Sequence, residues 1–168
     1  AGKQNLNYVI LGAGSNMLVS DGGFDGLVIR MTGGEIKIGG ERIIVDAGVM
    51  MARAVMASGK AGLGGFEWGI GVPGTIGGSI RGNAGCFGGE IKDIVESVNV
   101  LDMRTQITKS FSHQDCQFGY RSSIFKTHPE WVVVSAVLCL RNGDRQTIQQ
   151  EILRITKERI AKQDIGSK

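Results

Sequence analysis

Glycine is the feature that most constrains how this chain can fold. There are 27 glycines among the 168 residues, about 16%, against a usual share of about 7%. Glycine is needed where the backbone takes a positive φ or must approach a ligand closely. Because the excess is concentrated in segments between predicted strands, it predicts binding surfaces lined by main chain. A fold that is merely rich in turns is the alternative interpretation.

The rest of the composition is that of an ordinary globular domain or two small lobes, with 42% hydrophobic and 21% charged residues. A net charge of +3 without a stripe of Lys or Arg argues against nucleic acid as a partner. No apolar run reaches the ~18 residues that a membrane span requires. The odd set Cys86, Cys116 and Cys139 lacks a C-x-x-C pair, which favours reduced thiols and a cytoplasmic location.

Short strands dominate the predicted secondary structure. Apolar runs and alternating patterns predict strands over 8–11, 27–31, 36–38, 43–45, 94–101, 106–110 and 131–140, the last of them central. Two helices are expected. One covers 50–58 and ends at a Gly59 cap, and the other covers 145–162, with Asp144 or Thr147 as its cap and Ile148, Ile152 and Ile155 on one face. The intervening segment 59–89 has no clear period and is predicted to be ordered loop.

The first glycine-dense segment follows the strand over 8–11 and consists of Gly12, Ala13, Gly14, Ser15 and Asn16. A dinucleotide-binding Rossmann turn would need a third glycine at the sixth position and a helix after it. Met17 occupies that position, and residues 18–23 have turn chemistry instead. What remains is a nest of backbone N–H groups that could bind a phosphate without a helix, or an ordinary glycine turn.

The second glycine-dense segment covers 71–79 and continues through Asn83-Ala84-Gly85. Its small residues would allow the main chain to lie close to a flat ring or a pyrophosphate. Because so much buried backbone must be paired internally or by a ligand, two such segments in one small chain favour a bound cofactor.

These two segments, together with Gly-Tyr-Arg-Ser-Ser-Ile-Phe-Lys over 119–126, resemble the UDP-N-acetylenolpyruvoylglucosamine reductase family in order and spacing. The resemblance covers nearly the whole chain. It implies an α+β fold of the FAD-binding PCMH or vanillyl-alcohol-oxidase type, with mixed, mostly antiparallel sheets and few helices. Residues 1–31 would be the remnant of a first FAD-binding lobe and 32–165 the second lobe, and the C-terminal substrate domain would lie outside this chain.

The activity that the resemblance implies is reduction of an enolpyruvyl UDP-sugar to UDP-N-acetylmuramate, a precursor of peptidoglycan, with FAD as cofactor and NADPH as hydride donor. Arg121 matches the family's catalytic arginine, and Tyr120 would shape the substrate or nicotinamide site. A serine and a glutamate of the absent domain complete the chemistry, so this chain alone is expected to be inactive. The residues expected to bind the cofactor are Gly12, Ala13, Gly14, Ser15, Asn16, Pro73, Gly74, Thr75, Gly77, Gly78, Ser79, Asn83 and Gly85.

Other polar residues have plainer explanations. Lys126 is either a cation near a phosphate or an exposed lysine, and Glu67 and Glu90 are expected to pin loops. His113 and His128 stand alone, which predicts no metal site. Two rival functions stay open at this point: an FAD-binding module of another oxidoreductase with the same fold, and a non-catalytic structural fragment.

Overall fold

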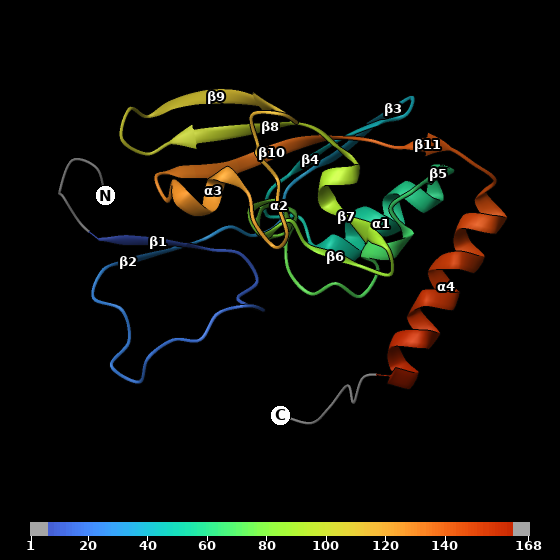
Figure 1. Ribbon diagram of the computed structural model, residues 1–168, viewed down its shortest axis with the longest axis horizontal. Helices are drawn as coiled ribbons and strands as arrows, with labels where there is room; N and C mark the ends of the chain where they lie inside the picture. The colour runs from blue at the N-terminus through green and yellow to red at the C-terminus, as the bar shows by residue number, and fades with distance from the viewer. Residues whose placement is uncertain (1–6, 163–168) are drawn as a thin grey trace.

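A five-stranded antiparallel sheet organises the fold in the computed structural model, which describes residues 7–162. Figure 1 shows this sheet along the top of the molecule with helices beneath it. The strands, in their spatial order, are β3 (Ile36–Gly39), β4 (Arg42–Asp46), β10 (Trp131–Cys139), β8 (Val95–Asp102) and β9 (Ile107–Ser112).

Strand β10 is central, as its long β-branched run predicts, and it pairs with β4 on one side and with β8 on the other. Val133, Ala136 and Leu138 are buried on the face that meets the helices. Val133 and Ala136 are three residues apart, which the period of two along a strand would not allow. A shift of register between Val133 and Ser135 acts as a β-bulge does, and it allows both Val133 and Ala136 to face the core.

Three two-stranded sheets surround the large one. β1 (Tyr8–Leu11) pairs in parallel with β2 (Leu27–Arg30). β5 (Leu63–Gly64) pairs with β11 (Arg141–Asn142), and β6 (Gly85–Cys86) pairs with β7 (Gly89–Glu90). The predicted strands and the hairpin over 36–45 are confirmed, and the sheets described are antiparallel apart from β1–β2.

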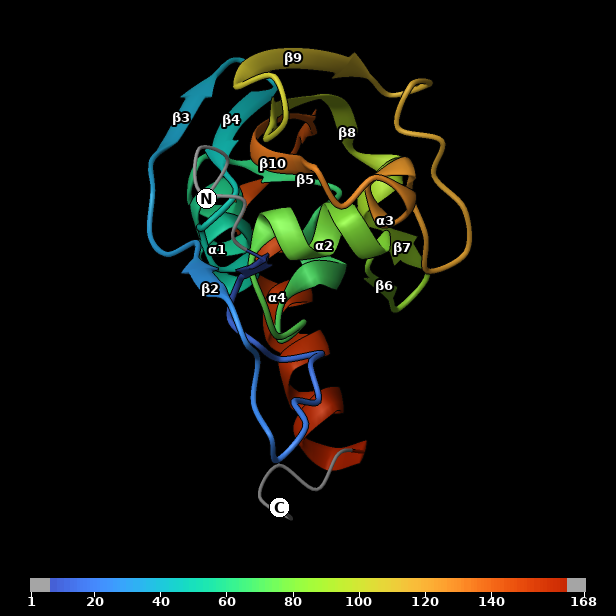
Figure 2. The same ribbon diagram turned by 90° about the vertical axis from the view of Figure 1, so that its left-hand side faces the viewer.

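Helices cover one face of the large sheet and bury the core against it (Figures 1 and 2). The core includes Ile43, Val45, Val98, Met51, Val55, Ile76, Ile80, Phe66 and Phe125, which are at most 1% exposed. The helical elements are α1 (Met51–Lys60), α2 (Ile76–Gly82), α3 (Ile124–Thr127), α4 (Arg145–Lys162) and the 3₁₀ turns η2 (Glu67–Gly69) and η3 (Ile91–Asp93).

The predicted C-terminal cap at Gly59 is wrong, because α1 continues through Gly59 and ends at Lys60. Gly59 is buried inside the helix, where a Cβ atom would stand 3.0 Å from the Cδ1 of Ile152 on α4. The glycine therefore lets α1 and α4 approach each other. The positive φ expected just after the helix occurs at Gly62 instead.

The prediction of loop throughout 59–89 is also wrong, since α2 forms inside it. Glycine lowers helix propensity, but Ile76 and Ile80, one turn apart, are both fully buried. Thr75 caps the helix by accepting a hydrogen bond from the N–H of Gly78 at 3.4 Å. Gly77 lies against Ala47, where a Cβ atom would stand 2.9 Å from the Ala47 Cβ. Burial and close packing thus outweigh propensity.

Helix α4 matches its prediction in extent and in its buried face of Ile148, Ile152 and Ile155. Asp144 provides the cap, because its carboxylate accepts hydrogen bonds from the N–H and the hydroxyl of Thr147, both at 2.7 Å. The helix packs on α1, β5 and η2.

The division into lobes over 1–31 and 32–165 stays a prediction, and residues 1–6 and 163–165 of those lobes lie outside the described residues. Over 7–162, none of the helices combines the length and the apolar character that a membrane crossing would require.

Candidate functional site

The first glycine-dense segment leaves the end of β1 as an open loop. Gly12, Ala13 and Gly14 are half-buried, whereas Ser15 and Asn16 are exposed. Among the described residues, no group accepts a hydrogen bond from the backbone N–H of any of these five. The segment continues as coil and turn to β2 rather than as a helix. It therefore offers backbone N–H donors that have no acceptor among the described residues and no helix behind them, as an anion-binding nest requires.

The second segment is held differently, because its backbone is paired with residues 47–51. The N–H of Ile76 donates to Val49 O and that of Gly77 to Ala47 O, both at 2.9 Å. The N–H of Gly78 already donates to the Thr75 side chain. These N–H groups already donate to acceptors within the chain. Contact of Gly77 or Gly78 with a cofactor stays a prediction, and these internal hydrogen bonds do not favour contact through their N–H groups.

The two segments meet each other. A Cβ atom at Gly12 would stand 2.6 Å from the Oγ1 of Thr75, and one at Gly74 would stand 3.0 Å from the Oγ of Ser15. Both approaches are closer than side chains normally allow, so the missing Cβ atoms are what permits the contact. Free N–H groups and bare main chain therefore form one surface, which suits a pyrophosphate and a flat ring.

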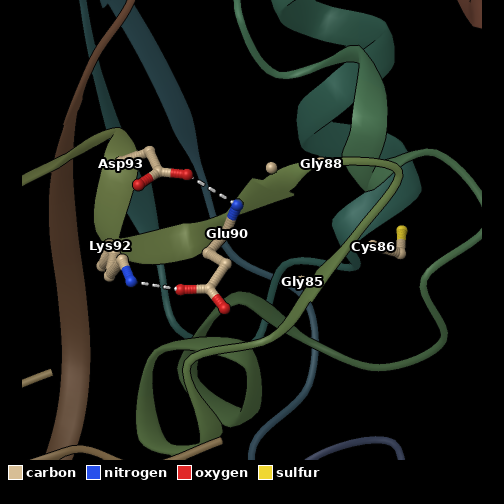
Figure 3. Close-up of a pocket in the computed structure, with 7 residues that line it drawn as sticks. Gly85, Cys86, Gly88, Glu90, Lys92 and Asp93 are labelled. Carbon is tan, nitrogen blue, oxygen red and sulfur yellow. Dashed lines mark hydrogen bonds and ion pairs between the residues drawn. The ribbon is translucent and has the colours of Figure 1, made fainter. Parts of the chain in front are cut away.

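Asn83 and Gly85 lie beyond the C-terminal end of α2, and Gly85 lines a surface hollow of ≈ 400 Å³ (Figure 3). Gly85 pairs with Glu90 across β6–β7, and a Cβ atom there would stand 2.7 Å from the Cγ of Glu90. Gly85 therefore has a packing role. Asn83 is fully buried and its side chain bonds to other parts of the chain. Direct contact of Asn83 or Gly85 with a cofactor stays a prediction.

Glu90 is the anionic centre of this hollow. Its carboxylate pairs with Lys92 Nζ at 2.6 Å, and its N–H donates to Asp93 Oδ2 at 2.8 Å (Figure 3). The carboxylate also accepts from Asn83 Nδ2 at 3.1 Å. The hydrogen bonds from Lys92 and Asn83 hold the pKa of Glu90 below its usual value. A carboxylate kept charged in this way pins the β6–β7 hairpin, which agrees with the plainer prediction for Glu90.

Tyr120 and Arg121 form the tip of a two-residue turn. Gly119 and Ser122, on either side, exchange backbone hydrogen bonds of 3.0 and 3.2 Å. Tyr120 is 86% exposed, so its ring does not pack in the core. Arg121 is exposed, has a φ of 51° and stacks its guanidinium 5.9 Å from the Tyr120 ring centre. Lys126 Nζ donates to Arg121 O, so Lys126 fixes the turn in this structure.

The structure thus brings the two glycine-dense segments together at the start of α2 and brings Asn83 to the Arg121 turn at its end. Sequence reasoning missed Ser123, which is 3% exposed and donates through Oγ to Arg81 O at 2.8 Å. A small hydroxyl side chain directly beside an apolar Ile-Phe pair is the signal that could have found it. Within residues 7–162, no three His, Cys, Asp or Glu side chains gather as a metal site would require.

Known proteins confirm the fold and the resemblance. Residues 1–110 match the model of the FAD binding domain family. The UDP-N-acetylenolpyruvoylglucosamine reductase of Clostridium tetani is 40% identical over 163 residues, which are 96% of this chain and 52% of that protein. The crystal structure of the reductase from Thermus caldophilus superposes with a TM-score of 0.82 at 30% identity, over 95% of this chain and 58% of that one.

A cholesterol oxidase from B. sterolicum shares the fold at a TM-score of 0.59 and 14% identity, over 84% of this chain and 31% of that one. The expected α+β fold with mostly antiparallel sheets is confirmed. The chain spans about half the length of the curated relatives that it matches. Because the family model covers well over half of the residues, this chain belongs to the FAD binding domain family.

Proposed function

We propose that this chain is the FAD-binding part of a UDP-N-acetylenolpyruvoylglucosamine reductase, which uses NADPH to form UDP-N-acetylmuramate for peptidoglycan synthesis. The observation that carries the proposal is identity of 36 to 40% with curated reductases across 96 to 98% of the chain. A likeness of that extent includes both glycine-dense segments and the Tyr120-Arg121 turn. The substrate is the one that the name of these relatives states, and the hydride donor and the overall reaction are those that the resemblance implies.

The surface where Gly12 meets Thr75 fits the cofactor. The free N–H groups of residues 12–16 are donors for a pyrophosphate, and the absence of Cβ atoms at Gly12 and Gly74 lets the backbone approach a flat ring. FAD, when bound, supplies the hydride-carrying chemistry between NADPH and the enolpyruvyl double bond.

The chain's own residues would bind and orient the substrate. The reaction adds one hydride and one proton across the enolpyruvyl double bond, while NADPH becomes NADP⁺. Arg121 would hold the adjacent carboxylate through two parallel N–H donors and stabilise the negative charge that develops beside it. Tyr120, exposed next to it, would form part of the wall of the same site. The proton donor would come from a segment outside this chain.

The free thiols of Cys86, Cys116 and Cys139 are compatible with a reducing compartment, and a cytoplasmic location belongs to the same proposal. The substrate is a small UDP-sugar, and the modest net charge offers no support for nucleic acid as a partner.

The test uses the full-length protein. Purified protein should show a flavin absorption band near roughly 450 nm and should oxidise NADPH rapidly only when UDP-N-acetylenolpyruvoylglucosamine is added. Oxidation of NADPH that is indifferent to this substrate would point to another oxidoreductase of the same fold. Absence of flavin after incubation with FAD would instead favour a non-catalytic structural role for this chain.

A further inference from the structure

Two side-chain hydrogen bonds tie the Arg121 turn to the end of α2. Asn83 Nδ2 donates to the carbonyl of Gly119 at 2.8 Å, just before the Tyr120-Arg121 tip. Ser123 Oγ donates to the carbonyl of Arg81 at 2.8 Å, just after it. One bond runs from the helix end to the turn and the other runs from the turn to the helix end. The tip is therefore held on both flanks by one helix terminus.

The Asn83 tether is itself rigid. Asn83 is 0% exposed and adopts a left-handed φ of 41°, a conformation that Asn tolerates better than most residues. Its Nδ2 also donates to Glu90 at 3.1 Å, and its Oδ1 accepts from the N–H of Lys92 at 3.1 Å. Because the amide is bonded on both sides, it has little freedom to turn away from Gly119.

The tip has little packing of its own. The side chains of Tyr120 and Arg121 are exposed, and the positive φ of Arg121 is a strained conformation for a non-glycine residue. A strained, exposed turn persists only where its surroundings determine it. The two tethers and the hydrogen bond from Lys126 supply that determination.

Helix α2 connects this turn to the glycine-dense surface. Its first turn is capped by Thr75, which contacts Gly12, and its last residues lead into Asn83. A seven-residue helix is about 10 Å long and cannot stretch. Its length therefore sets the separation between the predicted cofactor surface and the turn that bears the guanidinium.

We propose that Ser123 and Asn83 are positioning residues, which clamp the Tyr120-Arg121 turn to α2 and so hold the Arg121 guanidinium at a fixed place relative to the glycine-dense surface. The inference rests on the proposed function and deepens it. Asn83 then acts on Arg121 and not on the cofactor.

The first experiment is Ser123→Ala in the full-length protein, because it removes one hydroxyl and leaves the backbone unchanged. The overall oxidation of NADPH by the enolpyruvyl UDP-sugar can be followed in two steps. NADPH bleaches the flavin absorption band, and the band returns when the sugar is added. We expect the return to slow by about tenfold, since small misplacements of a catalytic group are costly. Bleaching by NADPH and flavin content should stay unchanged.

A readout that does not depend on activity is hydrogen exchange. The N–H groups of Gly119 and Ser122, which bond to each other's carbonyls across the turn, should exchange faster in Ser123→Ala without any FAD bound, while those of β10 should keep their rates. The matched control is Ser122→Ala, since among the described residues the Ser122 hydroxyl has no hydrogen-bond partner. It should change neither the exchange nor the return of the flavin band.

A double-mutant cycle separates positioning from general damage. If Ser123 acts through Arg121, adding Ser123→Ala to Arg121→Lys should slow the return of the band by less than about twofold, because the guanidinium is already gone. An equal loss in both backgrounds, or no loss in either, would overturn the proposal.

Asn83→Gly is the second variant if Ser123→Ala folds poorly. Glycine adopts the left-handed backbone without a steric cost, and loss of the amide removes the donor to Gly119 without placing a second carboxylate beside Glu90, so it should show the same selective loss. A wild-type rate in Asn83→Gly would remove that residue from the clamp. A wild-type protein that does not reduce the sugar at all would refute the proposed function, whereas normal wild-type turnover with unaffected variants would refute only the clamp.

Discussion

Gly12 lies so close to Thr75 that a Cβ atom at residue 12 would stand 2.6 Å from the threonine Oγ1. Thr75 cannot move aside easily, because it is 4% exposed and caps α2. The contact joins the end of β1 to the start of α2, and with it the two glycine-dense segments of the sequence. Their convergence, on which the predicted cofactor site depends, is therefore a property of the fold.

The first prediction concerns Gly12→Ala in the full-length protein. The added methyl group must displace the Thr75 side chain or the loop, and overpacking of this kind costs about 1–3 kcal/mol of stability. We expect a lower melting temperature and a lower ratio of flavin to protein absorbance, because the loop that offers its N–H groups is pushed from its place.

Gly22→Ala is the matched control for this experiment. Gly22 lies in the same connection, and its nearest neighbour to a Cβ atom would be Ser20 Oγ at 3.9 Å, so the methyl group has room. Equal flavin content in Gly12→Ala and Gly22→Ala would show that the close contact does not support the cofactor.

Much of the fold follows from local sequence patterns. The β-branched run of β10 and the alternation around Gly39 and Gly40 predict strands because their period matches the pleat of a sheet. Helix α4 is predictable in both extent and buried face because its isoleucines recur at helical spacing. These elements carry their signal within a few residues, so no knowledge of distant contacts is needed.

Elements that depend on distant partners could not be predicted. Helix α2 is rich in glycine and forms because Ile76 and Ile80 enter the core and Gly77 packs on Ala47. Gly59 continues α1 because Ile152 of α4 lies against it. In both places a local preference of glycine for turns is outweighed by packing against residues far away in the sequence.

The candidate site also has a part that local sequence predicts and a part that depends on distant contacts. The free N–H groups of Gly12 and its neighbours could be predicted from a glycine run after a strand. The role of Asn83 could not, because a buried amide reveals its partners only when β7 and the Arg121 turn are brought to it. Ser123 has a local signal, a hydroxyl beside an apolar pair, but its partner Arg81 is likewise revealed only by the fold.

The second prediction is that Arg121→Lys in the full-length protein keeps its flavin but loses about 10²-fold in the rate of sugar reduction. Lysine preserves the positive charge, yet it cannot offer two parallel donors to a carboxylate. The measurement is steady-state NADPH oxidation, together with the flavin spectrum.

The control for this substitution is Arg104→Lys, on the β8–β9 turn, where the arginine pairs with Glu130 at 3.4 Å on the surface. That variant should turn over like the wild type. A rate for Arg121→Lys within about twofold of the wild type would contradict the proposed role of the guanidinium fork.

The third prediction concerns the three thiols. Cys116 is 0% exposed, and burial raises the pKa of its thiol to about 12. Because alkylating reagents attack the thiolate, we expect iodoacetamide to label exposed Cys139 in the folded protein while Cys116 stays unmodified, as peptide mass spectrometry would show.

Unfolding in guanidinium provides the control, since Cys116 should then react at the rate of Cys139. The raised pKa also has a consequence for stability. Below the pKa of the unfolded thiol, about 8.5, the Cys116 thiol is neutral in both the folded and the unfolded protein, and its contribution to the free energy of unfolding is complete. It decreases as the pH rises above that value, because only the unfolded thiol then ionises. Labelling of Cys116 as fast as Cys139 in the native protein would contradict its burial.

The fourth prediction concerns the cap of α4. The backbone N–H and the hydroxyl of Thr147 donate to the Asp144 carboxylate and hold its pKa below the usual value. Asp144→Ala removes this acceptor and leaves the N–H of Thr147 to water. We expect the melting temperature at neutral pH to fall by roughly 2–4 °C.

The pH dependence distinguishes the cap from a general effect of the substitution. A carboxyl group with a lowered pKa in the folded state stabilises the protein above its unfolded pKa, about 3.9, and loses that contribution as the pH falls through the folded pKa. The melting temperatures of wild type and Asp144→Ala, followed by circular dichroism, should therefore converge in acid, whereas Gln150→Ala on the exposed face of α4 should track the wild type at every pH. A gap between wild type and Asp144→Ala that is constant from neutral pH into acid would mean that the charged carboxylate is not what caps the helix.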